Sequence, residues 1–168
     1  HPENGYPQGE YDMVQTVEVY RGSLVTGGSF AQIGGVNARG IARYNGTDWS
    51  SMGDVAGGCM GGVSYLGAGT IGGEAILVAA GGFSRIGTAP VQNVAYWKDH
   101  PIGGWHAFGN GLNGSIETVY VDTSAAGDRV FLGGAFTSAG GEQVNHVVEW
   151  DGSSFTPMGG GLDDWVLC

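Results

Sequence analysis

The chain has 168 residues, of which 35 are glycine, 13% are charged and 42% are hydrophobic, and its formal net charge is −10. This hydrophobic content excludes a disordered chain, and glycine without a Gly-X-Y period excludes collagen. One lysine and an acidic balance exclude the basic surface of a nucleic-acid-binding protein, and no apolar run is long enough to span a membrane.

The first predicted strand covers residues 14–19, and the sequence after it introduces a repeat. Phe30 is followed by Phe83 and Phe136 at intervals of 53 residues. A second set of aromatic residues keeps the same interval, and a third set follows the next turn in each copy. These two sets are Tyr44, Trp97 and Trp150, and then Trp49, Trp105 and Phe155. Fixed spacing over three copies indicates a repeat protein whose units pack on their neighbours.

Each copy is predicted to hold four short strands, joined by turns. In the third copy the strands cover residues 115–123, 128–136, 145–152 and 154–159. These segments are rich in β-branched and aromatic residues and are bounded by Gly, Asn and Asp, which is typical of strands. The "YNGTDW" and "WDGSSF" stretches predict tight hairpins, because Asn-Gly and Asp-Gly tolerate positive φ. No segment has a convincing helical period.

A unit of four antiparallel strands cannot bury both of its faces alone, but stacked units can. We therefore expect an all-β, β-propeller-type array of three four-stranded antiparallel blades of about 53 residues plus one extra strand, with a β-solenoid as the alternative. The nine periodic aromatic residues are predicted to form the blade core, and the paired glycines before each phenylalanine to admit a neighbouring blade. The expected division is an N-terminal segment over 1–13, blades over 14–60, 61–113 and 114–161, and the first strand of a fourth blade over 162–168.

The repeats resemble a known family of glycine-rich propeller repeats. The stretches are "LVTGGSFAQIGGVNARGIARYNGTDWSSMG", "LVAAGGFSRIGTAPVQNVAYWKDHPIGGWHAFGNGLNG" and "FLGGAFTSAGGEQVNHVVEWDGSSFTPMGGGL". They are similar to repeats of bacterial extracellular proteins and fungal cortical marker proteins, and their layout resembles kelch blades. Ala80 and Thr88 depart from the paired-glycine pattern. The resemblance implies a binding or structural module that is extracellular or at the cell surface.

The last seven residues, "LDDWVLC", align with "LNGSIET" at the start of the third copy. Three blades are fewer than the four to eight that usually close a ring, and an open strand edge favours pairing. We expect the partner to be either the remaining blades of a longer chain or other copies of this chain.

Five residues are candidates for covalent or interchain roles. Cys59, Cys168 and Trp165 are candidates for a disulfide or an interchain contact, with buried thiols as the alternative for the cysteines. Asn45 and Asn113 begin Asn-x-Ser/Thr motifs in predicted turns and are candidate glycosylation sites. The alternative is that turns simply favour Asn-Gly.

No group of residues at workable spacing indicates catalysis, so we expect no enzyme activity, no cofactor and no metal. His1 could bind copper through its amine, Asp163 and Asp164 could bind Ca²⁺, and Asp151 lies in a weak likeness of a sialidase aspartate box. Each of these three readings is less favoured than an ordinary structural one. The sequence thus predicts a non-catalytic extracellular scaffold or interaction module. The alternatives are a self-assembling fibre subunit that exchanges strands, and a lectin that binds glycans.

Overall fold

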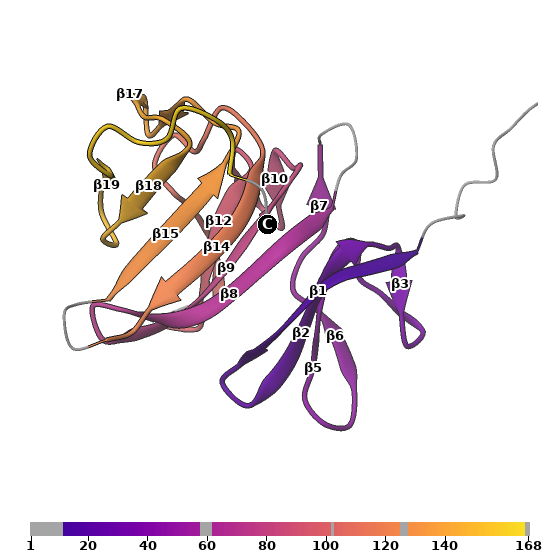
Figure 1. The fold of residues 1–168 in the computed structure, drawn as a ribbon. Coiled ribbons are helices and arrows are strands. Elements are labelled where there is room, and N and C mark those ends of the chain that lie inside the picture. Colours follow the sequence, from indigo (N-terminus) through magenta and orange to yellow (C-terminus); the bar gives the residue numbers. More distant parts are fainter. Residues whose placement is uncertain (1–11, 58–61, 102, 125–127, 167–168) are drawn as a thin grey trace, which may run out of the picture.

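The computed structural model describes residues 12–57, 62–101, 103–124 and 128–166. These residues form strands and turns without a helix, so none of them forms a helix that could cross a membrane. The expectation of an all-β chain with four-stranded antiparallel units is confirmed, because three such sheets follow one another along the sequence (Figure 1).

Each sheet is a meander of four strands, interrupted by a small hairpin between its second and third strands. The first sheet contains β1 Met13–Tyr20, β2 Ser23–Ser29, β5 Ile41–Tyr44 and β6 Trp49–Ser51. The second sheet contains β8 Val63–Ile71, β9 Glu74–Gly81, β12 Val94–Lys98 and β13 Gly104–Ala107. The third sheet contains β14 Ile116–Asp122, β15 Arg129–Gly134, β18 Val147–Trp150 and β19 Phe155–Pro157.

The small hairpins lie at the Gly-Gly turns of the first and third repeats and at Gly87-Thr88 of the second. They pair β3 Gln32–Ile33 with β4 Val36–Asn37, β10 Arg85–Ile86 with β11 Ala89–Pro90, and β16 Ser138–Ala139 with β17 Glu142–Gln143. A further short strand, β7 Val55–Ala56, lies after the first sheet and pairs with β10 in the second repeat. Sequence reasoning treated these segments as turns, because two-residue strands are too short to show a period.

The second glycine of each pair is required by a bulge within its own sheet. The first strand of every sheet shifts register at the same place, between Val14 and Thr16, Val63 and Tyr65, and Ile116 and Thr118. A Cβ on Gly28, Gly81 or Gly134 would collide with a main-chain oxygen at the start of that strand or just before it. Both glycines of the first pair also lie close to the second repeat: a Cβ on Gly27 would lie 2.6 Å from Val63 Cγ1, and a Cβ on Gly62 would lie 2.6 Å from the main-chain oxygen of Gly28. Gly28 thus lies at a bulge of its own sheet and also close to the main chain of the second repeat.

Main-chain hydrogen bonds around this bulge recur in all three sheets. The second glycine donates its N–H to the carbonyl of the residue before the third strand, over 2.9–3.0 Å. The three copies join Gly28 to Gly40, Gly81 to Asn93, and Gly134 to His146. The acceptor residue has positive φ each time, and Asn93 and His146 adopt it without being glycine. Since the sequences differ here, the repeat is kept by main-chain geometry.

The turn between the third and fourth strands is closed by a side chain in the first and third sheets. Asn45 Oδ1 accepts the amides of Thr47 and Asp48 at 2.8 and 2.9 Å. Asp151 Oδ1 accepts two main-chain amides, those of Ser153 and Ser154, both at 2.9 Å. These bonds stabilise the carboxylate and lower the pKa of Asp151 to about 2. Asp151 is therefore accounted for as a turn residue.

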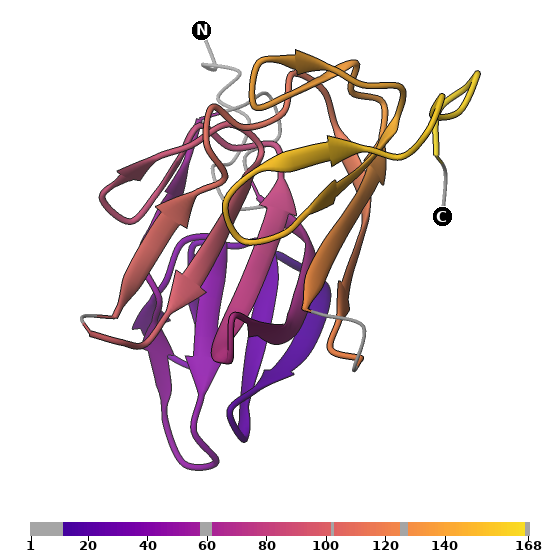
Figure 2. The same cartoon turned by 90° about the vertical axis from the view of Figure 1, so that its left-hand side faces the viewer.

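The first strands of the three sheets lie side by side, with β8 in contact with both β1 and β14 (Figure 1). The long strands keep this neighbouring arrangement in the view turned by 90° (Figure 2). One apolar core lies between the first and second sheets, and another lies between the second and third. The second sheet is thus covered on both sides.

Candidate functional site: the seams between the sheets

We call the contact between the first and second sheets the first seam, and that between the second and third sheets the second seam. The buried core of the first seam consists of Tyr20, Val25, Ile41, Met52, Val55, Val63, Leu66, Leu77, Ala79, Phe83, Ile86, Ala95 and Trp105. The second seam buries Ile71, Ile76, Val78, Ala80, Val94, Phe108, Leu112, Ile116, Val130, Leu132, Phe136, Ala139, Val144, Val148 and Trp150. Burial of apolar area is the dominant favourable term in such contacts.

Each seam is crossed by a connecting segment that pairs with the hairpin of the following sheet. Val55 pairs with Ile86 in the first seam, and Leu112 pairs with Ala139 in the second. The same segments donate a main-chain hydrogen bond back to the preceding sheet. The three copies of this bond run from Val55 N to Arg39 O, from Leu112 N to Gln92 O, and from Leu162 N to Asn145 O. Leu162 therefore occupies the position that Val55 and Leu112 hold inside the seams.

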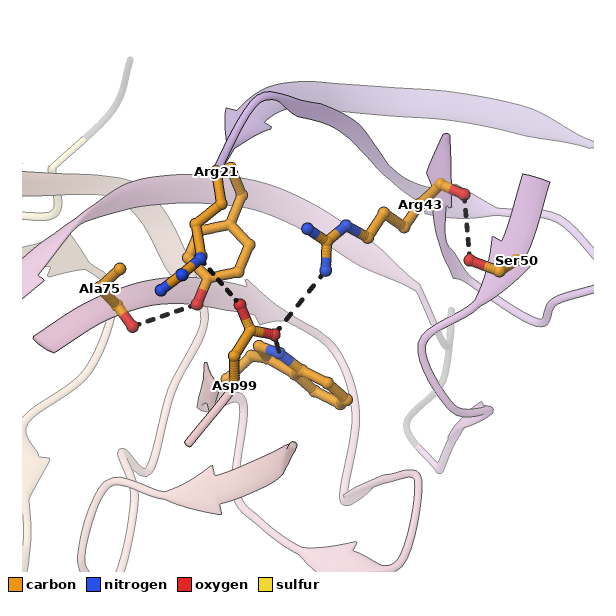
Figure 3. Close-up of polar contacts among 7 residues, drawn as sticks. Arg21, Arg43, Ser50, Ala75 and Asp99 are labelled. Atoms are coloured by element: carbon orange, nitrogen blue, oxygen red, sulfur yellow. Dashed lines mark hydrogen bonds and ion pairs between the residues drawn. The ribbon is translucent and has the colours of Figure 1, made fainter. Parts of the chain in front are cut away.

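A polar cluster around Asp99 joins the first and second sheets (Figure 3). Its carboxylate accepts the Nε1–H of Trp97 at 2.8 Å. Arg21 Nε lies 3.3 Å and Arg43 Nη1 lies 3.7 Å from the two carboxylate oxygens. One carboxylate of the second sheet is thus held by two guanidinium groups of the first, which makes this cluster the main charged link in the seam.

Tyr20 lies beneath this cluster and is buried. Its hydroxyl donates to the main-chain oxygen of Ala75 at 3.1 Å, and the Arg43 guanidinium lies 5.7 Å from its ring centre. Burial, followed by the nearby Asp99 carboxylate, raises the pKa of Tyr20 to about 12. The neutral phenol is therefore the form that fits this seam.

Two local features of the sequence position the cluster. The sequence after β12 has a longer turn than its counterparts, and the Asp99 carboxylate in this turn lies against Arg21 of the first repeat. Arg21 begins the two-residue turn between β1 and β2 with φ at 49°, where the second sheet has Gly72 at φ 59°. A non-glycine residue in this region is strained, so the arginine is placed at a small conformational cost.

The second seam uses different polar groups at the same end of the strands. Asp128, which precedes β15, accepts the hydroxyl of Thr70 at 2.9 Å and the amide of Gly73 at 3.3 Å. Farther along β8, the Tyr65 hydroxyl donates to Glu117 Oε2 at 3.1 Å. Neither arrangement repeats the arginine–aspartate cluster of the first seam.

The nine aromatic residues predicted for the blade core differ in how deeply they are buried. All three phenylalanines of the repeat, Phe30, Phe83 and Phe136, are buried. Trp105 and Trp150 are also buried, and the remaining members are half-buried. These are Tyr44, Trp49, Trp97 and Phe155. Of these, Trp49, Trp97 and Phe155 pack against the buried cores.

Two of the aromatics contribute directly to the seams. Trp105 Nε1–H donates to the main-chain oxygen of Met52 at 2.6 Å across the first seam. In the second seam Trp150 contacts Tyr96 and Phe108, with ring centres 5.0 and 4.2 Å apart. The aromatic rings therefore tie sheets together as well as filling their interior.

The residues predicted for glycosylation, disulfide formation or metal binding do not come together in one site among the described residues. Asn45 and Asn113 are both exposed, but Asn113 donates its Nδ2–H to Thr137 Oγ1 and accepts two amides through Oδ1. Trp165 is exposed, and residues 162–166 form no strand. His1, Cys59 and Cys168 lie outside the described residues. Within the described residues, no cluster of three or more His, Cys, Asp or Glu side chains could hold a metal ion.

Sequence reasoning missed the Asp99 cluster and the Asp128 contacts. The one available signal was the longer turn of the second repeat, which carries Asp99. Comparison of the chain with protein-family models, with curated proteins and with solved structures finds no match. The seams are therefore interpreted from their own geometry.

Proposed function

We propose that this chain is a non-catalytic β-propeller-type scaffold that acts outside the cell or at its surface. The observation that supports this most is the relation between successive sheets. Each first strand lies against the next, and each seam is crossed by a connecting segment that pairs with the following hairpin. Units that are joined only to their neighbours build a rigid array, whose exposed loops can vary without disturbing the cores.

The seams favour a structural role because their polar groups are used in holding sheets together. Asp99 is held by Arg21, Arg43 and Trp97, and Asp128 is held by the turn of the second sheet. A catalytic acid or base would need access to a substrate and a free lone pair or proton. The cluster is instead satisfied internally.

Binding and activity assays test this proposal against its alternatives. We expect the purified chain to show no turnover on polysaccharide, peptide or ester substrates and no selective binding on a glycan array. Turnover that is lost in the Asp99→Asn variant would contradict the scaffold and indicate an enzyme. Selective glycan binding would favour the lectin.

Secretion from a eukaryotic cell tests the two candidate glycosylation sites. Asn45 is exposed at a turn and makes no hydrogen bond through Nδ2 among the described residues, whereas Nδ2 of Asn113 is engaged. When the chain is secreted from a eukaryotic cell, we expect one N-linked glycan, lost in Asn45→Gln and kept in Asn113→Gln. A secreted chain without a glycan on Asn45 would count against glycosylation there.

A further inference from the structure

The first sheet presents an apolar surface that its sister sheets bury. We call the exposed side chains of Val14, Val17 and Val19 on β1 the N-face. Val17 and Val19 are 58% and 62% exposed. The counterpart of Val17 in β8, Leu66, is buried in the first seam. The N-face therefore corresponds to the side of the second sheet that packs against the sheet before it.

The third sheet shows how such a face is covered. The counterparts of Val17 and Val19 in β14 are Val119 and Val121, which pack on the second sheet. A Cβ on Gly67 would lie 3.0 Å from Val119 Cγ1, so the glycines of β8 leave room for these valines. β1 exposes the same residue type at the same register without such a neighbour among the described residues.

The third sheet also carries the opposite surface. We call the exposed side chains of Met158, Leu162 and Trp165 the C-face. Met158 is 41% and Leu162 is 48% exposed, although their counterparts inside the seams are fully or almost fully buried. Those counterparts are Met52 and Phe108 for Met158, and Val55 and Leu112 for Leu162.

The pairing of Val55 and Leu112 in the seams predicts that the hairpin of a following sheet should cover Leu162. Val55 pairs with Ile86, and Leu112 pairs with Ala139, each in the hairpin of the following sheet. The residue at that position in the first sheet is Ile33 of β3, which is half-buried. The first sheet thus has both the N-face and the hairpin that a C-face requires.

We propose that the N-face of one copy binds the C-face of a second copy, head to tail, so that two copies close through two equivalent contacts. This rests on the proposed function, and it continues the two seams already present within the chain. Two copies would contribute six sheets, which lies within the four to eight blades of closed propellers. A head-to-tail contact that closes after two copies leaves neither face exposed.

Sedimentation velocity and native mass spectrometry of the full chain test this pairing. We expect a dimer, with Val19→Asp on the N-face and Leu162→Asp on the C-face each giving monomers. Both residues are already exposed, so circular dichroism should show that the variants remain folded. Thr47→Asp, in the exposed turn between β5 and β6, is the matched control and should leave the dimer unchanged.

Mixing the two variants distinguishes head-to-tail pairing from other dimers. Val19→Asp keeps an intact C-face and Leu162→Asp keeps an intact N-face, so an equimolar mixture should form a dimer through one remaining contact. A monomeric wild-type chain, a dimer that survives either substitution, or assembly beyond two copies would overturn the proposal. A monomer that retains both internal seams would overturn this pairing alone and leave the scaffold function standing.

Discussion

The two seams share their apolar packing and main-chain pairing but differ in their polar groups. The first seam places Asp99 between Arg21 and Arg43, whereas the second places Asp128 on Thr70 and the Gly73 amide. The shared apolar packing and main-chain pairing stabilise the contact between successive sheets. The polar contacts of Asp99 and Asp128 differ between the seams. They favour one particular neighbour for each sheet, since burying a charged group without its partner costs free energy.

The largest effect is expected from substitutions in the apolar cores that both seams share. Phe83→Ala in the first seam and Phe136→Ala in the second should each lower the free energy of unfolding by about 3–5 kcal/mol, the usual cost of truncating a buried phenylalanine. Urea denaturation of both variants measures it, with Thr47→Ala as an exposed control. A loss below about 1 kcal/mol for either phenylalanine would mean that it does not belong to a core.

A smaller effect is expected at the bulge that supports both seams. In Gly81→Ala the new methyl group would collide with the main-chain oxygen of Gly62, which should cost about 1–3 kcal/mol or more. Gly82 has open space around its Cβ position, and the third repeat already has Ala135 there. Gly82→Ala should therefore be neutral. Thermal unfolding that shows equal losses for the two variants would contradict the assigned role of the bulge.

High pH should act on the first seam through Tyr20. Because its pKa is raised from 10 to about 12, the unfolded chain ionises before the folded one. This contribution is intact below pH 10 and is lost as pH rises from 10 to 12, by up to about 2–3 kcal/mol. Relative to Tyr20→Phe, the wild-type chain should lose stability over this window. A constant difference between the two proteins would contradict burial of the neutral phenol.

The Asp99 cluster should give the smallest effect and the clearest contrast between the seams. Asp99→Asn leaves two arginines without their carboxylate, and since the groups are partly exposed the loss should be about 1 kcal/mol. Added salt should reduce it. Glu74→Gln removes an exposed pair with Lys98 and should cost less. Equal losses for the two variants would mean that the cluster adds nothing to the seam.

Much of the fold follows from short-range signals in the sequence. The 53-residue interval, the four strands of each copy and the Asn-Gly and Asp-Gly turns depend on neighbouring residues and are readable from them. The two-residue hairpins could not be predicted, because strands of two residues are too short to show a period, and the pairing of β7 with β10 joins segments of different repeats.

The candidate site was harder to predict from the sequence, because its residues come from two different sheets. Arg21 and Asp99 are 78 residues apart in the sequence, and the other repeats do not carry this arginine–aspartate pair. Periodicity identifies what copies have in common, so it finds Phe30, Phe83 and Phe136 and passes over the polar groups that differ. The second glycine of each pair illustrates the same limit, since its spacing was visible but its contact with the bulge was not.

The proposed propeller-type array requires successive sheets to be related by one repeated rotation about a shared axis near β1, β8 and β14. A crystal structure of the chain tests it most directly, by superposing the first sheet on the second and the second on the third. We expect both superpositions to give the same rotation about the same axis, with Phe30, Phe83 and Phe136 overlapping. Two unrelated rotations, or a simple translation between sheets as in a solenoid, would contradict it.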